Sequence, residues 1–488
     1  MTDKKLVSID EYSLPKDWKA STLADVTEYI QRGKGPKYIE HSDLPVINQK
    51  CIRWFGIQKE HLKYVDPAQW TAWAPERYIR VGDILWNSTG TGTIGRAAII
   101  KNLAPEEKYV VDSHVTIVRP KGVDPQYVHY WIMSPAVQGS IEAMQSGSTN
   151  QVELSKLAVE ALPIPVAPLD QQKRIVAEIE KQFSRLDEAV ANLKRVKANL
   201  KRYKAAVLKA AVEGRLVETE AELARREGRS YETGAQLLQR ILETRRSQWQ
   251  GKGKYKEPAA PDTTELPELP EGWVWTTVGE LGDVIGGLTK NPKRAALPVK
   301  LPYLRVANVY ANELRLDEIE EIGVEECELE KLLVQKGDLL IVEGNGSPDQ
   351  IGRLAIWDGS ITPCVHQNHL IKVRLPQGYL PKWVMTWLIS PGGRNRIRDV
   401  SSSTTGLYTL SVGKVGSLSV PLPPKEEQES IVAEIDRRLS LIGETIAQVD
   451  ANVQRAERLR QSILRCVFSG RFFAGLQTKL SQEVMLNG

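Results

Sequence analysis

Cysteine is scarce in this sequence. The 488 residues include only Cys51, Cys327, Cys364 and Cys466. They are scattered, without CxxC spacing, and this argues against both a disulfide framework and a zinc site. We therefore expect four ordinary thiols and no bound metal.

Long apolar runs and a strong charge imbalance are also missing. No stretch approaches the roughly 18 apolar residues of a membrane span, and the N-terminal MTDKKLVSIDEYSLP lacks the apolar core and cleavage site of a signal peptide. We therefore expect a cytoplasmic protein. The 65 Lys and Arg against 61 Asp and Glu give a net charge of +4, which permits a polyanionic partner without requiring one.

The most regular feature is a pair of long amphipathic segments, residues 168–214 and 424–470. Each begins with a proline and acidic residues and ends with a glycine, which are start and stop signals of a helix. Each helix would be roughly 70 Å long, and a two-stranded coiled coil is the simplest way to bury its apolar stripe. The residues expected to pair are Ile175, Ile179, Leu186, Leu193, Leu200, Val207, Ile431, Ile435, Ile442, Val449, Leu459 and Ile463.

These helices belong to a larger internal repeat. LPKDW, which ends at Trp18, recurs as LPEGW, which ends at Trp273, 255 positions later. The motifs GD[IL]L, IGR, SP, LS and IVAEI recur in the same order at offsets of 255 to 257. A nearly constant offset indicates a tandem duplication. Residues 26–80 and 284–335 nevertheless share little, so each half combines a common framework with content of its own.

The repeat predicts an α+β fold. Short β-branched runs between Gly, Pro and Asn favour two similar mixed α/β domains with many loops, and a Pro-rich stretch after residue 250 favours a linker. The expected segments are a first domain (14–165), a first long helix (166–216), a helical spacer and linker (217–268), a second domain (269–420), a second long helix (421–471) and a C-terminal tail (472–488).

The combination of motifs resembles one known family. A domain that opens on LPxxW, carries a GDxL strand and a Gly-rich loop ending in IGR, and runs through PxxxQxxIVAEI into a long helix occurs twice. This arrangement is similar to the DNA-specificity subunit of type I restriction-modification enzymes. The resemblance covers nearly the whole chain. It implies two target-recognition domains separated by antiparallel coiled-coil helices, each domain reading one half of a split site in double-stranded DNA.

The resemblance also implies partners and cofactors. Two methyltransferase subunits, which methylate adenine at N6, would dock beside this chain, and restriction subunits with translocase and nuclease activity would join them. The chain itself would be non-catalytic and without a cofactor, so S-adenosylmethionine, ATP and Mg²⁺ are expected only on the partner subunits. Two similar domains about a pseudo-two-fold axis would address opposite DNA strands.

Two Gly-rich loops are the first candidate DNA contacts. NSTGTGTIGRA (87–97) and EGNGSPDQIGRLA (343–355) approach the phosphate-binding GxxxxGK[ST] motif but lack its lysine and hydroxyl, and predicted strands follow them instead of helices. Such loops suit contact with a DNA backbone or groove, although plain connecting turns remain an alternative. The candidates are Asn87, Ser88, Thr89, Thr91, Thr93, Arg96, Asn345, Ser347 and Arg353.

Two basic loops, QRGKGPK and TKNPKR, and two polar runs, SGSTNQ and SSSTTGLY, recur at comparable places in the halves. Contact with phosphates or base edges is the functional interpretation, and solvated surface is the alternative. The basic-loop candidates are Arg32, Lys34, Lys37, Lys290, Asn291, Lys293 and Arg294, and the polar-run candidates are Ser148, Thr149, Asn150, Gln151, Ser402, Ser403, Thr404, Thr405 and Tyr408.

Other patterns carry less weight. His366 and His369 form an HxxH without an acidic companion, and the other half offers only His114, so a metal site is not expected. The recurring His114 and His369 could be structural or could face DNA. Trp383 and Trp387 lie in apolar contexts that favour the core. The alternative class is a self-contained DNA methyltransferase or nuclease. No [ND]PP[YFW] tetrad occurs, which argues against the methyltransferase, and no acid pair with a nearby lysine is evident, which argues against the nuclease.

Overall fold

The computed structural model describes residues 7, 9, 14–54, 56–90, 92–146, 152–251, 253–347, 350–404 and 407–469. Its contacts divide the chain into two compact units. The first comprises residues up to Lys194 together with those from Asp450 onward, and the second comprises Arg195–Val449. Each unit therefore holds one repeat and a part of both long helices. None of the helices in the described ranges combines the length and apolar composition that crossing a membrane requires.

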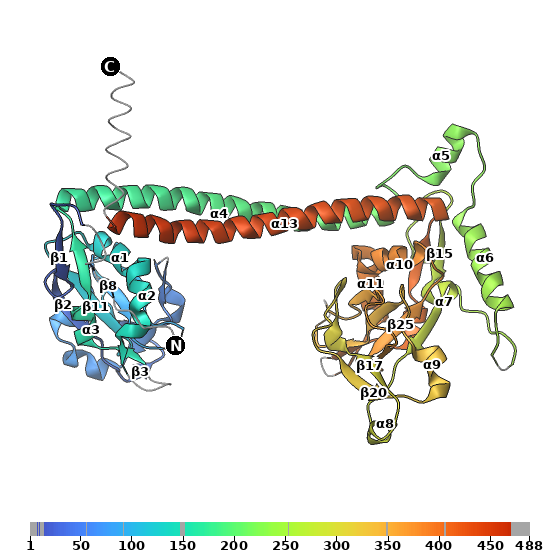
Figure 1. Cartoon of the computed structure of the whole chain (residues 1–488), viewed down its shortest axis with the longest axis horizontal. Helices are drawn as coiled ribbons and strands as arrows, with labels where there is room; N and C mark the ends of the chain where they lie inside the picture. Colours follow the sequence, from blue (N-terminus) through green and yellow to red (C-terminus); the bar gives the residue numbers. More distant parts are fainter. Residues whose placement is uncertain are drawn as a thin grey trace, which may run out of the picture. The chain divides into compact units, whose positions relative to one another are not determined.

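An antiparallel sheet in the order β2-β11-β8-β9 forms the centre of the first unit. Ile84 and Trp86 belong to the cluster around α1, whereas Leu85 between them belongs to a second cluster with Ile52. This is the two-residue alternation of a strand buried on both faces. The elements are β2 (Thr27–Arg32), β8 (Ile84–Asn87), β9 (Ala97–Ile99), β11 (Val115–Pro120) and α1 (Pro125–Met133), and Figure 1 shows α1 beside this sheet.

Smaller elements complete the first unit. The second sheet has the order β10-β4-β7-β3, and β1 pairs with β14, β5 with β6 and β12 with β13. Their bounds are β1 (Lys19–Thr22), β3 (Tyr38–Ile39), β4 (Pro45–Ile47), β5 (Ile52–Arg53), β6 (Gly56–Ile57), β7 (Lys63–Val65), β10 (Val110–Val111), β12 (Gln145–Ser146), β13 (Glu153–Leu154), β14 (Pro163–Val166), α2 (Pro135–Met144) and α3 (Lys156–Glu160).

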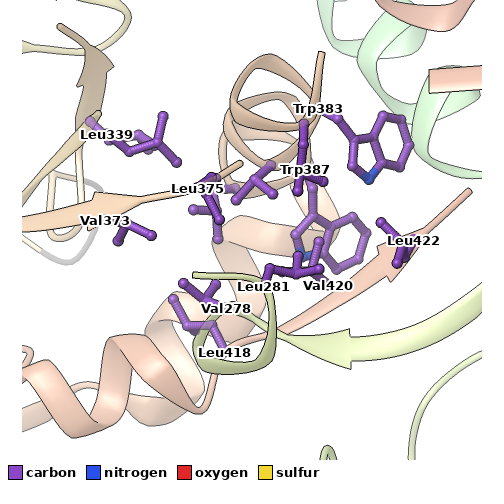
Figure 2. Packing of buried hydrophobic residues seen from close by; sticks show 14 of the residues in the cluster. Val278, Leu281, Leu339, Val373, Leu375, Trp383, Trp387, Leu418, Val420 and Leu422 are labelled. Atoms are coloured by element: carbon purple, nitrogen blue, oxygen red, sulfur yellow. The ribbon is translucent and has the colours of Figure 1, made fainter. Parts of the chain in front are cut away.

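The second unit repeats this design. Its central sheet has the matching order β16-β25-β21-β23, and α10 packs beside β23. The Trp383 and Trp387 side chains of α10 lie in the same buried cluster, beside Val420 and Leu422 (Figure 2). Both indoles are buried and donate to backbone oxygens, at 2.7 Å to Pro421 and 2.8 Å to Ser419, so their assignment to the core is confirmed. The elements are β16 (Asp283–Gly286), β21 (Leu339–Val342), β23 (Leu354–Ile356), β25 (Leu370–Arg374) and α10 (Leu380–Ile389). The predicted fold class is confirmed.

The remaining elements of the second unit include two helices in the spacer, α5 (Glu220–Glu227) and α6 (Gly234–Ser247), both opened by a threonine capping box. The others are β15 (Val274–Thr277), α7 (Val278–Leu281), α8 (Pro292–Ala295), β17 (Lys300–Leu304), β18 (Val309–Tyr310), β19 (Glu313–Leu314), β20 (Glu320–Gly323), α9 (Glu326–Leu332), β22 (Gly344–Asn345), β24 (Val365–His366), α11 (Pro391–Val400), β26 (Ser402–Thr404), β27 (Leu407–Thr409), α12 (Val412–Gly416) and β28 (Ser419–Leu422).

A buried ion pair explains the recurring GD[IL]L motif. Arg119 at the end of β11 donates from Nε and Nη2 to the carboxylate of Asp83, both at 2.7 Å. In the second unit Arg374 at the end of β25 binds Asp338 in the same bidentate way, at 3.0 and 2.7 Å. Asp83 thus holds the turn before β8 to the end of β11, and Asp338 holds the turn before β21 to the end of β25. The role of both aspartates is structural.

The long helices α4 (Leu169–Val212) and α13 (Lys425–Phe468) pack together. In the first unit Ile175 and Ile179 share a cluster with Val467, and in the second unit Leu208 shares one with Ile431 and Ile435. The beginning of each helix therefore meets the end of the other, as expected for an antiparallel pair. Other buried seam positions are Val207, Ile442 and Val449, and Leu186, Leu193, Leu200 and Ile463 are half-buried.

The prediction that Leu459 belongs to this seam is wrong, because its side chain is 46% exposed. The next residue, Arg460, occupies the seam instead. Its guanidinium lies 4.9 Å from the ring centroid of Phe183 and pairs with Asp187. Leu464, which was not predicted, is buried in the same cluster. One helical position rotates a side chain by about 100°, so the apolar pattern alone misplaced the seam here.

The two repeats differ where each long helix begins. In the first unit Trp18 Nε1 donates to Gln171 Oε1 at 3.0 Å. In the second unit Trp273 Nε1 donates to Glu427 Oε1, also at 3.0 Å, and Glu427 Oε2 accepts from the Glu220 backbone N–H. Glu427 is only 2% exposed. Burial, reinforced by the nearby carboxylates of Glu220 and Glu222, raises the pKa of Glu427 to about 7.

This carboxyl makes the stability of the second unit pH-dependent. Between its ordinary pKa of 4.5 and about 7, Glu427 binds a proton in the folded state but not in the unfolded state, so its contribution to stability falls as the pH rises through that window. The loss is at most about 3 kcal/mol. We expect the variant Glu427→Gln to lack this decrease when the free energy of unfolding is measured in denaturant at pH 5 and pH 8.

Gln171→Glu is the matched control, since it places the same carboxyl at the equivalent position of the first unit, near Asp17. With this variant, the free energy of unfolding of the first unit should also decrease as the pH rises. Equal pH profiles of the wild type and Glu427→Gln would contradict the assignment.

Candidate nucleic-acid interface

Hydrogen bonds of its own side chains fix the shape of the Gly-rich loop in the first unit. Asn87 Nδ2 donates to the backbone oxygens of Gln49 and Thr93, at 3.1 and 3.3 Å, and Thr93 Oγ1 donates to Gln49 Oε1 at 3.1 Å. Gly90 and Gly95 have φ values of 97° and 87°, a region that favours glycine. The strand β9 follows the loop, so it is not a phosphate-binding loop that opens a helix.

Three further segments converge on this loop. Thr89 forms an isolated β-bridge with Glu153, and its hydroxyl lies 2.6 Å from Nδ1 of His114. Arg32 binds Glu153 at 2.7 Å and donates from Nε to the Ser113 oxygen at 3.0 Å. The fold thus brings together the Gly-rich loop, the strand β13 that follows the polar run, the histidine turn and one residue of the basic loop.

The predicted contacts of this loop differ in accessibility. Asn87 and Ser88 are 0% exposed, so they shape the loop and do not present a surface to DNA. Thr89, Thr93 and Arg96 are half-exposed, and Arg96 Nη2 donates to the Gly92 oxygen at 2.8 Å. Five other candidates lie outside the described residues, namely Thr91, Ser148, Thr149, Asn150 and Gln151.

The second unit assembles the equivalent segments. β22 in the Gly-rich loop pairs with β27 in the polar run, so Asn345 lies opposite Tyr408 in the backbone register. Oε2 of Glu343 lies 3.1 Å from Nδ1 of His369. Ser402 accepts from Lys414 Nζ at 2.7 Å. Thr405 lies outside the described residues, as do the side chains of Asn345, Ser403 and Thr404.

Arg353, which ends the second Gly-rich loop, is held more firmly than Arg96. Its Nη2 donates to the Val306 oxygen at 3.0 Å, and its guanidinium lies 4.9 Å from the ring centroid of Tyr310. Arg315 stacks on the same ring at 3.8 Å. Ser347, which precedes Arg353 in the same Gly-rich loop, is half-buried. Two guanidinium groups on one tyrosine ring concentrate positive charge beside the loop.

The basic loops do not match each other. Lys34 and Lys37 are exposed, and Lys37 pairs with Asp66 at 3.0 Å. In the second unit Arg294 makes a bidentate pair with Glu328, at 2.8 and 2.7 Å, which braces α8 against α9. Lys290 pairs with Glu320 at 2.8 Å. Lys293 is exposed, and Asn291 accepts from the Arg294 N–H as the N-cap of α8.

Several residues at these clusters escaped the sequence reasoning. Gln49, Tyr310 and Arg315 come from the segments that differ between the halves, whereas Glu153 and Glu343 lie beside recurring motifs but are acidic. His114 and His369 did carry a signal, because they recur 255 positions apart. Both are exposed at the Gly-rich loops, which favours the DNA-facing alternative.

The HxxH pair does not converge on one point. His366 is fully buried, with Nε2 3.5 Å from the Ile285 oxygen, and burial lowers its pKa to about 4. His369 is exposed. Over the described ranges, no group of three or more His, Cys, Asp or Glu side chains is placed to hold a metal ion.

Comparison with known proteins finds one family of similar proteins. Residues 15–202 match the family model for the type I restriction modification DNA specificity domain. The EcoKI specificity subunit of Escherichia coli K12 is 23% identical over 475 residues, which cover 94% of this chain and 90% of that protein. The StySPI specificity subunit of Salmonella potsdam is also 23% identical, with the same coverage. Over nearly its whole length, the chain is similar to the DNA specificity subunits of type I restriction-modification enzymes.

Solved structures agree with this similarity at the level of the fold. A chain from a study of assembly and conformational transition of the type I restriction-modification system aligns with a TM-score of 0.64 at 17% identity, over 94% of this chain and 99% of that one. The HsdS subunit from Thermoanaerobacter tengcongensis aligns with a TM-score of 0.54 at 17% identity, over 95% and 99%. The chain therefore matches the fold of these structures along nearly its whole length.

Proposed function

We propose that this specificity subunit reads a bipartite site in double-stranded DNA, with one half-site for each repeat. The observation that carries the proposal is the convergence, in both units, of a Gly-rich loop, a histidine turn and a third segment on the same backbone framework. The third segment is β13, just after the polar run, in the first unit, and it is the polar run itself in the second unit. Different side chains on that framework suit two different half-sites. Residues 14–165 and 269–420 are the proposed recognition domains, and the long helices are the proposed scaffold between them.

The proposed DNA contacts are the exposed and half-exposed members of these clusters. In the first unit they are Thr89, Thr93 and Arg96, with Arg32, Lys34 and Lys37 beside them. In the second unit they are Ser347, Arg353, Ser402, Tyr408, Lys290 and Lys293. The bidentate pair with Glu328 assigns Arg294 to bracing α8, and the burial of Asn87 and Ser88 assigns them to loop shape.

We further propose that the subunit is non-catalytic and works within a larger complex. Two methyltransferase subunits and restriction or translocase subunits are the proposed partners, and S-adenosylmethionine, ATP and Mg²⁺ would be bound by them. The match of residues 15–202 to the specificity-domain family and the absence of the [ND]PP[YFW] tetrad from the sequence support this assignment.

Alanine substitutions of the two loop arginines test the proposed interface. Arg96→Ala and Arg353→Ala should weaken DNA binding while assembly with the partners persists. A lost phosphate contact lowers the salt-dependence slope by about one, whereas a lost base contact costs about 1–3 kcal/mol and relaxes one position. Binding isotherms at several salt concentrations distinguish the two.

Arg226→Ala is the control, since this arginine is exposed on α5 and pairs with Glu218. It should leave both the affinity and the slope unchanged. Unchanged affinity, slope and sequence preference in both loop variants would remove Arg96 and Arg353 from the interface.

A further inference from the structure

Ser88 in the first repeat and Glu343 in the second make the same two backbone hydrogen bonds. In the first unit the Ser88 N–H donates to the His114 oxygen at 2.9 Å, and the Leu154 N–H donates to the Ser88 oxygen at 2.8 Å. In the second unit the Glu343 N–H donates to the His369 oxygen at 2.9 Å, and the Leu410 N–H donates to the Glu343 oxygen at 2.8 Å. Ser88 and Glu343 are therefore structurally equivalent, each between the histidine turn and the leucine that follows the polar run.

The side chains at this position differ in direction and chemistry. Ser88 is fully buried, and its hydroxyl contacts that of Thr116. The side chain of Glu343 is 29% exposed, and Oε2 lies 3.1 Å from Nδ1 of His369. One carboxylate oxygen thus has a fixed partner, so the side chain is oriented while part of it still reaches solvent.

A carboxylate at this place is unfavourable for simple phosphate binding, because it repels the DNA backbone. An ionised carboxylate only accepts hydrogen bonds. The donors that base pairs present in the major groove are the exocyclic amino groups, N4 of cytosine and N6 of adenine, and carboxylates accept from cytosine N4 in known complexes.

We propose that Glu343 is a specificity-determining residue, which accepts a hydrogen bond from the exocyclic amino group of cytosine or adenine in the half-site read by the second repeat. His369 is its positioning residue. The inference rests on the proposed function and adds the chemistry of one contact to it.

The first repeat offers a contrast at its own histidine turn. There His114 contacts the hydroxyl of Thr89, at 2.6 Å. A hydroxyl both donates and accepts, so it discriminates less between base edges than a carboxylate does. The requirement for an amino group is therefore assigned to the second half-site alone.

Methylation mapping of the whole complex tests the inference. The wild-type chain and Glu343→Gln are each co-expressed with the methyltransferase subunits, and modified adenines are mapped across a genome. We expect the wild-type motif to hold A or C at one strand position of the second half-site. In the variant, discrimination at that position alone should fall roughly 5- to 150-fold, with a shift toward adenine, which glutamine recognises through N6 and N7.

Two further variants keep the result interpretable. Glu343→Ser introduces the residue that the first repeat has at this position, so the backbone framework accommodates it, and it should relax the same base pair. Glu330→Gln removes an exposed carboxylate from α9 and should leave the motif unchanged. An unaltered motif in both Glu343 variants, or increased binding to all sequences alike, would overturn the inference. A wild-type complex without a two-part motif would instead refute the proposed function.

Discussion

Replacing Asp83 with alanine is expected to lower the free energy of unfolding of the first unit by about 3–5 kcal/mol, the usual cost of leaving one partner of a buried ion pair without the other. Asp83 is fully buried and the side chain of Arg119 is only 7% exposed. Arg119 would keep its bonds to the backbone oxygens of Glu76 and Tyr78, but its charge would lose the bidentate carboxylate.

The second repeat provides a graded comparison. Asp338→Ala breaks the equivalent pair, but the side chain of Arg374 is 24% exposed, so water can solvate the orphaned guanidinium and the loss should be smaller. Asp43→Ala removes an exposed carboxylate from the first unit and should change little. Denaturant unfolding measures all three. A loss below about 1 kcal/mol for Asp83→Ala would contradict a structural role for this pair.

Changing the length of the helix pair is expected to have the largest effect on DNA recognition. One heptad inserted in the middle of both α4 and α13 keeps the apolar seam in phase. It adds roughly 10 Å along the pair, or about three base pairs at 3.4 Å each. If the helices set the spacing of the half-sites, the variant either loses binding or prefers a longer gap, since three base pairs also turn the second half-site by about a third of a turn.

The half-site sequences themselves should not change in such a variant, because the insertion leaves both loop clusters untouched. Methylation mapping of folded, partner-bound complexes separates the two quantities. Altered half-site letters with an unaltered gap would contradict a spacing role for the helices.

The duplication, the fold class and the long helices could be predicted because they depend on local periodicity and on a repeat that one sequence contains twice. The helices run over 169–212 and 425–468, close to the expected 166–216 and 421–471. The seam was less predictable. Leu459 and Arg460 are neighbours, and the choice between them depends on Phe183 and Asp187 of the other helix.

The composition of the candidate interface was harder to predict because it depends on long-range pairing. The segment after the polar run reaches the Gly-rich loop through the bridge between Thr89 and Glu153, and nothing local in the sequence indicates that contact. Likewise, Arg294 resembles a DNA-binding residue in the sequence. In the structure its charge is neutralised by Glu328, which lies 34 positions away. Glu343 was overlooked because an acidic residue does not fit a search for basic and polar loops.

Methylation mapping of the wild-type complex tests the central claim most directly. The chain is co-expressed with its methyltransferase partners, and every N6-methylated adenine is located in the host genome. The proposed function predicts one asymmetric motif with two specified half-sites, separated by a gap of fixed length and unspecified sequence, and with one methylated adenine on each strand. Methylation at a single continuous motif, or the same methylation when this chain is omitted, would contradict it.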